Sequence, residues 1–172
     1  MTDVTTALTL VIPAEFHDSI NSIRKQYDRA FPRWMPHINF IFPFVPVEQF
    51  NEISQKLQNG LKGFGGFQLE LTEIGYFPQG KNATFHLKPK DTSRIKDLFD
   101  IIMKILPDIK VKHQEFNPHL TLGQCKKAEV DGKIEEVRSQ LSKGISFTVD
   151  RIFIINRTKD DPFKIHTEIS LN

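Results

Sequence analysis

Two short segments of this chain carry the same pattern of residues. Pro36-His37-Ile38-Asn39-Phe40 and Pro118-His119-Leu120-Thr121-Leu122 each place a histidine after a proline, and a small hydrogen-bonding residue two positions later. An unperturbed imidazole titrates at a pKa of about 6.5, so histidine exchanges protons near neutral pH. Two copies in matching surroundings, nearly half the chain apart, indicate paired histidines that serve one site. Such a pair is suited to general acid–base catalysis.

Successive side chains of a β-strand point to opposite faces of the sheet. His37 and Asn39 are therefore predicted to share one face, as are His119 and Thr121, while the apolar residues between them face the core. One imidazole would accept a proton and the other would donate one. Asn39 and Thr121 would donate hydrogen bonds to the oxygens of a phosphate in the transition state. This chemistry requires no metal and no cofactor.

The remaining patterns predict a mixed α+β fold. Apolar spacing indicates four amphipathic helices: 16–27, a second from about Val47 with Gly60 just past its end, a third through 95–102 behind the capping segment 91–93, and a fourth through 134–141 before Gly144. Alternating or β-branched runs predict seven strands, at 6–12, 37–44, 67–77, 83–88, 116–122, 145–155 and 163–171.

The repetition extends beyond the two motifs. Each is followed by a predicted helix, a strand, a loop and a further strand, so that Phe67 is matched by Ile145, and Phe85 by Phe163. This order indicates an internal duplication within one domain, residues 1–172, made of two interleaved lobes. A pseudo-two-fold axis between the lobes would bring the two histidines face to face across a cleft.

Composition limits the possible functions. The chain has 172 residues and a net charge of +2, and its 23 basic residues are scattered among 21 acidic ones. Tight coating of a long duplex is therefore not expected, and a compact phosphate-bearing ligand fits better. The single cysteine, Cys125, is expected to be an inert thiol, and there is no Cys/His cluster with zinc spacing. Without a recognisable secretory leader or an apolar span, the chain is expected in the cytoplasm or the nucleus.

With its two motifs, the chain resembles the two-histidine (2H) phosphoesterases, which include bacterial RNA 2′,5′-ligase-like proteins and cyclic phosphodiesterases. Their signature is a pair of His-x-Thr/Ser-x tetrapeptides about half a domain apart. This sequence departs from it at Asn39, where the family usually has a hydroxyl, although an amide also donates hydrogen bonds. The resemblance implies a bilobal fold with two antiparallel sheets that flank a central groove, helices outside, and metal-independent cleavage of phosphodiesters.

The expected function is hydrolysis of 2′,3′-cyclic phosphates or 2′,5′-linked ribonucleotides by His37 and His119. The expected partner is a small nucleotide or a single-stranded RNA-derived substrate, and the protein is expected to be a monomer. A nucleotide- or RNA-binding module that kept the groove and lost catalysis is the alternative, suggested by Asn39. A metal hydrolase that uses both histidines as ligands would lack a carboxylate in either motif.

Further substrate contacts are predicted on weaker patterns. Phe85 and Phe163, at matching places in the repeat, are expected to stack on a base or ribose, although a core role fits them equally well. The remaining candidates, for which rim packing or solvated charge is the alternative, are Trp34, Tyr76, Arg157, Lys159 and Lys126. His86 and His166 are read as surface or packing residues, and His17 and His113 are given no role.

Overall fold

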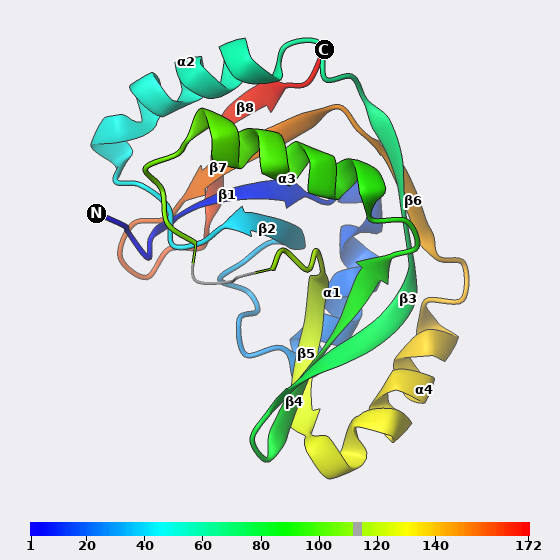
Figure 1. Cartoon of the computed structure of the whole chain (residues 1–172). Coiled ribbons are helices and arrows are strands. Elements are labelled where there is room, and N and C mark those ends of the chain that lie inside the picture. The colour runs from blue at the N-terminus through cyan, green and yellow to red at the C-terminus, as the bar shows by residue number, and fades with distance from the viewer. Residues whose placement is uncertain (112–114) are drawn as a thin grey trace.

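The computed structural model describes residues 1–111 and 115–172, so His113 lies outside the described residues. Within these ranges the chain forms four α-helices and eight strands (Figure 1). In chain order they are β1 (Thr6–Val11), α1 (His17–Tyr27), β2 (His37–Ile41), α2 (Phe50–Leu61), β3 (Phe67–Gln79), β4 (Asn82–Pro89), α3 (Ser93–Ile105), β5 (Leu120–Lys126), α4 (Val130–Gln140), β6 (Ile145–Val149), β7 (Arg151–Asn156) and β8 (Lys164–Ser170). Short 3-10 turns lead into α1, α2 and α4.

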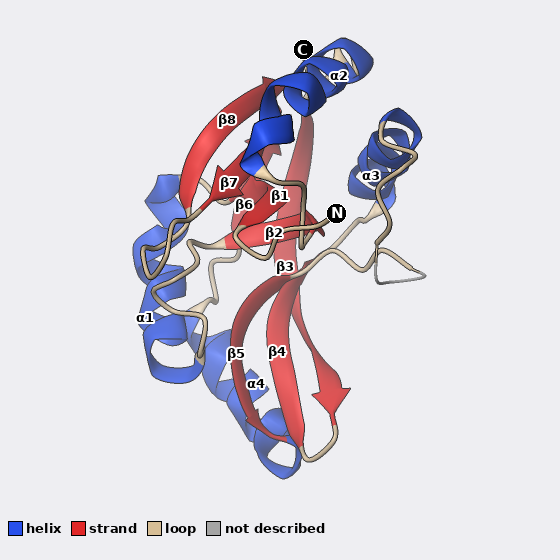
Figure 2. Ribbon diagram, turned by 90° about the vertical axis from the view of Figure 1, so that its left-hand side faces the viewer, coloured by secondary structure: helices blue, strands red, loops and turns tan. Residues whose placement is uncertain are grey.

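The strands form two antiparallel four-stranded sheets, in the orders β2-β1-β7-β8 and β5-β4-β3-β6. Figure 2 shows the first sheet in the upper part of the view and β3, β4 and β5 in the lower part, with helices on the outside. The long strand β3 joins the two regions, because its first residues pair with β6 and its later residues pair with β4. The predicted α+β fold with two antiparallel sheets is therefore confirmed.

The two histidine motifs occupy equivalent positions in the two sheets. β2 and β5 are both edge strands, and each pairs with a single neighbour, β1 or β4. In sheet position, the unit β1-α1-β2 thus matches β4-α3-β5. The prediction that the strands of Phe85 and Phe163 are equivalent is wrong, because β4 pairs with a motif strand whereas β8 pairs only with β7.

A bulge of the same kind interrupts both motif strands. Leu8 pairs with Ile41 and Thr9 with Asn39, which leaves Phe40 as an extra residue. In β5 the extra residue is Leu122, because Phe85 pairs with Gly123 and His86 with Thr121. Each bulge lies three residues after a motif histidine. Bulges are frequent beside active sites, where they redirect side chains.

Two predicted boundaries are corrected. Gly60 lies inside α2 and not beyond it. A Cβ at this position would come 2.4 Å from Ile105 Cδ1, so a glycine here lets α2 pack closely on α3. The strand predicted at 116–122 instead runs from Leu120 to Lys126. Gly123 lies within this strand and is required for packing, because an added Cβ would lie 2.4 Å from Tyr27 Cβ on α1.

Helix α1 precedes the first motif in the chain and packs against β5, the strand of the second motif. The Tyr27 hydroxyl extends this contact by donating to Glu136 Oε1 of α4 at 2.6 Å.

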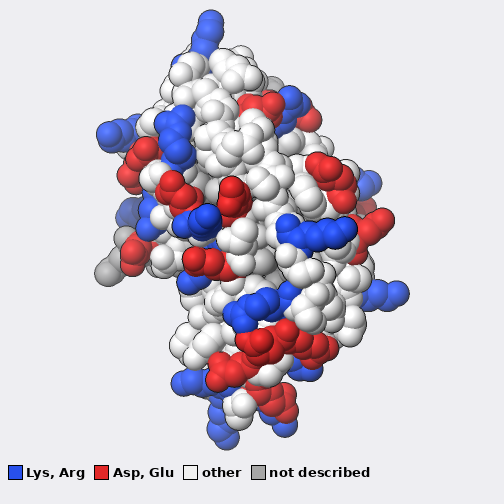
Figure 3. Space-filling view, turned by 90° about the vertical axis from the view of Figure 1, so that its right-hand side faces the viewer, with Lys and Arg blue, Asp and Glu red and all other residues white. Residues whose placement is uncertain are grey.

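No helix within the described part of the chain is long and apolar enough to cross a membrane. On the face drawn in Figure 3, basic and acidic side chains are interspersed, with no continuous basic stripe.

Candidate active site

His37 is the first residue of β2, and a layer of buried groups holds its ring. Its Nδ1 lies 2.6 Å from the carbonyl oxygen of Met35. Because a carbonyl only accepts hydrogen bonds, Nδ1 carries the proton and the neutral ring presents the lone pair of Nε2. The ring stacks on Trp34 with a centroid separation of 4.5 Å.

Trp34 is itself fixed by a buried ion pair. Arg24 Nε lies 2.9 Å from Asp28 Oδ2, and Arg24 Nη2 donates to the Trp34 carbonyl at 2.8 Å. On its other side the indole packs on Phe163 at 3.9 Å between ring centroids. The position of His37 therefore depends on a chain of buried contacts that begins in α1.

This environment lowers the pKa of His37 to about 4. Burial is the largest cause, because a low-dielectric environment disfavours the imidazolium. The positive charges of Arg24 and His119 lower the pKa further, while the Met35 carbonyl and Asp28 act in the opposite direction. His37 is therefore neutral at pH 7.

His119 immediately precedes β5 and repeats the backbone arrangement of His37. Its Nδ1 lies 2.8 Å from the carbonyl oxygen of Asn117, again two residues earlier in the chain. The edge of its ring meets the Phe77 ring of β3 at a centroid distance of 4.8 Å. Its side chain keeps part of its surface exposed.

A third histidine belongs to the same cluster, and sequence reasoning had read it as a surface or packing residue. His86 of β4 is 3% exposed, lies 5.2 Å from His119 between ring centroids, and stacks on Phe77 at 4.3 Å. Burial, together with the charge of His119, lowers the pKa of His86 to about 4. A possible signal was its position in the strand next to the second motif. Recognising that position requires the order of the strands in the sheet, which the spacing of residues along the sequence does not give.

A groove of about 500 Å³ lies between the two motif strands. It is lined by Asn39 from the first motif, by His119 from the second, and by Phe77 from β3. Its volume is in the range typical of small-molecule sites. The structure thus brings Asn39 and His119 to one cavity, whereas His37 is not among the residues that line it. The charge of His119 still contributes to the lowered pKa of His37.

The polar residues of the motifs face buried polar residues across the sheet. Asn39 pairs with Thr9 of β1, and Thr121 pairs with His86 of β4. Within the described residues, Thr9 Oγ1, Asn39 Oδ1 and His86 Nδ1 are buried without a hydrogen-bond partner. The Thr84 carbonyl is close enough to raise the pKa of His86 somewhat, but it does not complete a hydrogen bond to Nδ1. Of these three residues only Asn39 lines the groove, and Thr9 and His86 lie beside the motif strands as their ladder partners.

Several of the predicted substrate contacts are corrected. Phe85 is 0% exposed and packs against Tyr27 in the core, so it offers no face to a ligand. Phe163 and Trp34 are 5% and 8% exposed, and they support His37 from beneath instead of forming a platform or a rim. Tyr76 is 40% exposed, but it alternates with Phe77 along β3 and so points away from the groove.

None of the predicted cationic residues lines the groove. Lys126 ends β5, roughly 20 Å along the strand from the second motif. There it lines a separate surface cavity with Lys81 and Lys127. Lys159 is exposed in the loop after β7, and its carbonyl accepts a 2.6 Å hydrogen bond from Arg157 Nη1. The Arg157 guanidinium lies 5.7 Å from the Phe163 ring centroid, so its contact with a substrate stays a prediction.

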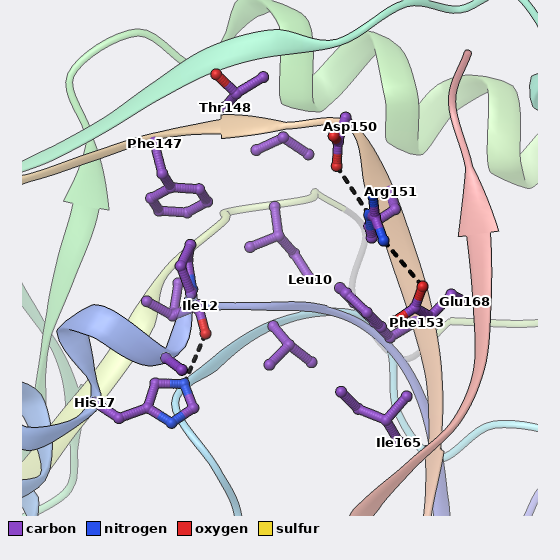
Figure 4. A pocket seen from close by; sticks show the side chains of 14 residues that line it. Leu10, Ile12, His17, Phe147, Thr148, Asp150, Arg151, Phe153, Ile165 and Glu168 are labelled. Carbon is purple, nitrogen blue, oxygen red and sulfur yellow. Dashed lines mark hydrogen bonds and ion pairs between the residues drawn. The ribbon is translucent and has the colours of Figure 1, made fainter.

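A second pocket, of about 370 Å³, is lined by none of the motif residues (Figure 4). Leu10, Phe147 and Phe153 form its apolar surface. Its polar groups are already engaged: His17 Nε2 lies 2.6 Å from the Ile12 carbonyl oxygen, and Arg151 pairs with both Asp150 and Glu168 at 3.0 Å. The groove that joins the two motifs is therefore the better candidate for chemistry. Among the described residues, no cluster of three or more His, Cys, Asp or Glu could hold a metal ion.

Two antiparallel sheets with a histidine motif at each facing edge define the two-histidine phosphoesterase class. A model of the 2′-5′ RNA ligase superfamily matches residues 12–161, and the chain belongs to this family. A Staphylococcus haemolyticus protein named "Putative phosphoesterase SH1944" is 27% identical over 118 residues, which cover 68% of this chain and 69% of the relative. A Bacillus cytotoxicus protein named "Putative phosphoesterase Bcer98_0945" is 23% identical over 168 residues, which cover 94% of each chain.

Solved structures share the fold at low sequence identity. Escherichia coli LigT complexed with 3′-AMP has a TM-score of 0.64 at 14% identity and covers 97% of each chain. TT0787 of Thermus thermophilus has a TM-score of 0.63 at 14% identity, covering 96% of this chain and 97% of its own. Kluyveromyces marxianus Usb1 with uridine monophosphate reaches 0.53 at 11% identity, covering 93% of this chain and 96% of its own.

Proposed function

We propose that this protein hydrolyses 2′,3′-cyclic phosphates or 2′,5′-linked ribonucleotide phosphodiesters without a metal, by general acid–base catalysis from His37 and His119. The observation that carries the proposal is the groove lined by Asn39 of the first motif and His119 of the second, together with the identical tethering of the His37 and His119 imidazoles through Nδ1. Neighbours in fold that bind 3′-AMP and uridine monophosphate support a small nucleotide as the ligand.

His37 is assigned the role of general base. Its Nδ1 is committed to the Met35 carbonyl, so Nε2 is the nitrogen that can take a proton from an attacking water. Its lowered pKa keeps Nε2 unprotonated at pH 7. Nearby phosphate charge would raise that pKa on substrate binding, which would make the ring a stronger base when it is needed.

His119 is assigned the role of general acid. Its Nδ1 is held by the Asn117 carbonyl and its ring keeps part of its surface exposed, so Nε2 is the nitrogen from which its imidazolium form would donate a proton. From Nε2 it would protonate the departing ribose oxygen as the bond between that oxygen and phosphorus breaks. Water supplies the new P–O bond, so a cyclic phosphate becomes a 2′- or 3′-phosphomonoester.

Asn39 and Thr121 would stabilise the charge that builds up on the non-bridging oxygens. The buried end of the Asn39 amide is its oxygen, which supports an orientation with the NH2 group toward the groove. An amide NH2 can then take the place of the hydroxyl that the family usually has at this position.

The test is turnover of 2′,3′-cyclic mononucleotides and of 2′,5′-linked oligoadenylate in EDTA, with 2′- and 3′-phosphate products resolved. His37→Ala and His119→Ala should each abolish turnover while circular dichroism and thermal unfolding show a folded chain. His166→Ala, which changes an exposed histidine on β8, is the matched control. More than a tenth of wild-type activity in both single variants would refute the assignment, and ligand binding without product would favour the binding module.

A further inference from the structure

The asparagine of the first motif has a potential partner that the family signature does not include. Thr9 of β1 lies directly across the ladder from Asn39, and both are on the sheet face that carries His37. Thr9 is 0% exposed, and its Oγ1 has no hydrogen-bond partner within the described residues. Asn39 Oδ1, the buried end of the amide that lines the groove, is equally unmatched.

These two atoms are chemically complementary. A hydroxyl donates one hydrogen bond, and an amide oxygen accepts it. Residues directly opposite in an antiparallel pair have Cβ atoms about 5 Å apart, which is within reach of a threonine and an asparagine side chain. Catalytic hydrogen bonds are often long in an empty site and tighten when the ligand binds.

We propose that Thr9 is a positioning residue, whose hydroxyl donates to Asn39 Oδ1 and so holds the Asn39 NH2 group toward the substrate phosphate. An amide needs this restraint because its two ends are nearly equal in shape, and the flipped orientation would turn an oxygen toward an anion. A threonine hydroxyl at position 39 would need no such partner, since it rotates to suit its acceptor. The inference rests on the proposed function for the identity of the anion, and on the cross-strand pair for the role of Thr9.

The same strand provides a matched control. Thr6 of β1 is also 0% exposed, but its hydroxyl donates to the Val45 carbonyl at 2.7 Å. Thr6→Val should therefore lower the melting temperature and leave kcat unchanged. Thr9→Val removes a hydroxyl that has no hydrogen-bond partner among the residues that the structure describes, so it should leave the melting temperature equal or higher. At the same time it should lower kcat about tenfold, which is the effect of one hydrogen bond.

A double-mutant cycle with Asn39→Thr separates orientation from packing. In the Asn39→Thr background, Thr9→Val should change kcat less than twofold, because the new hydroxyl no longer depends on Thr9. An equal loss of kcat in both backgrounds, or a fully active Thr9→Val variant, would overturn the inference.

The dissociation constant for inorganic phosphate, measured by NMR on the same four proteins, gives a second readout. It should rise about tenfold in Thr9→Val and remain unchanged in the Asn39→Thr background. If the wild-type protein binds phosphate with this pattern but turns over no phosphodiester, the proposed function fails and the role of Thr9 stands. If the dissociation constant for phosphate is the same in Thr9→Val as in the wild type, the inference fails whatever the turnover assay shows.

A second inference comes from ring contacts in the other half of the groove. We infer that His86, with Phe77, is a positioning residue that fixes the ring of His119. The three rings contact one another in pairs, with centroid distances from 4.3 to 5.2 Å. Gly75, directly across from His86, makes room for this arrangement, because a Cβ there would lie 3.2 Å from His86 Nε2.

Two substitutions separate this role from simple filling of the core. His86→Phe keeps the aromatic contacts and should retain most of kcat, whereas His86→Leu should lower kcat about tenfold with KM changed less than twofold. The NMR signals of the His119 ring should broaden or double in the leucine variant only. Wild-type kcat in His86→Leu, or an equal loss in both variants that tracks the melting temperature, would overturn this inference.

Discussion

His86 should make the protein less stable at mildly acidic pH. Its folded-state pKa is lowered to about 4, while an unfolded chain would protonate the same ring at about 6.5. As the pH falls, the unfolded chain binds the proton first and is stabilised by it. The contribution of the neutral ring is therefore fully present above pH 6.5 and is lost as the pH falls toward 4.

The size of the effect follows from the two pKa values. Between pH 7 and pH 5, the difference amounts to about 2 kcal/mol of unfolding free energy for this histidine. For a chain of this length, that corresponds to a fall in melting temperature of roughly 4 to 8 °C. This is a substantial part of the total stability of a typical domain, which is about 5–15 kcal/mol.

The assay is urea unfolding of the wild type and of His86→Phe at pH 7 and pH 5. Phenylalanine keeps the stack on Phe77 but cannot bind a proton, so this variant should lose about 2 kcal/mol less than the wild type on acidification. Comparing the two proteins at the same pH cancels the titration of the carboxylates. His166→Gln, which removes an exposed histidine, should behave as the wild type. Equal pH dependence in wild type and His86→Phe would refute the reasoning.

Three further outcomes are expected. Gly123→Ala should lower the unfolding free energy by about 3 kcal/mol in urea titrations, because its Cβ would lie 2.9 Å from the backbone of Tyr27; wild-type stability would contradict this packing. Trp34→Ala should cost about 3–5 kcal/mol in the same assay and lower kcat more than tenfold, because His37 loses its stacking partner; an unchanged kcat would show that the stack is dispensable. Lys126→Glu should leave kcat/KM for a 2′,3′-cyclic mononucleotide within twofold in a steady-state assay, because this residue ends β5 away from the groove, and a larger loss would place it at the site.

Local patterns were sufficient to predict most of the elements and the two catalytic candidates. The apolar spacing of Phe16, Ile20, Ile23 and Tyr27 corresponds to α1, and the predicted strands at 67–77 and 83–88 correspond to β3 and β4. These features depend on neighbours close in the chain, which the sequence displays directly. The duplicated motif pointed to equivalent strands for the same reason.

What the sequence could not predict depends on contacts between distant segments. Phe85 and Phe163 occupy matching positions in the linear repeat, but the order of strands in a sheet is not their order in the chain. Phe85 therefore lies on the inner strand β4, whereas Phe163 packs on Trp34, which supports His37. The bulge at Phe40 has no sequence signature, since it exists only relative to the partner strand. His86 was misjudged because it lacks the motif and acquires its neighbours only through strand pairing.

Because the two motifs hold their histidines in the same backbone arrangement, the proposed division of labour between His37 and His119 depends on their surroundings. Both imidazoles are tethered in the same way, through Nδ1 to a carbonyl two residues earlier. His37 is stacked on a buried indole close to the positive charge of Arg24, which disfavours a second positive charge. His119 faces His86, a ring that is neutral at pH 7. One ring kept neutral and a second ring able to donate a proton are what the proposed acid–base catalysis at a single phosphorus atom requires, and the lowered pKa of His37 supplies the first of these.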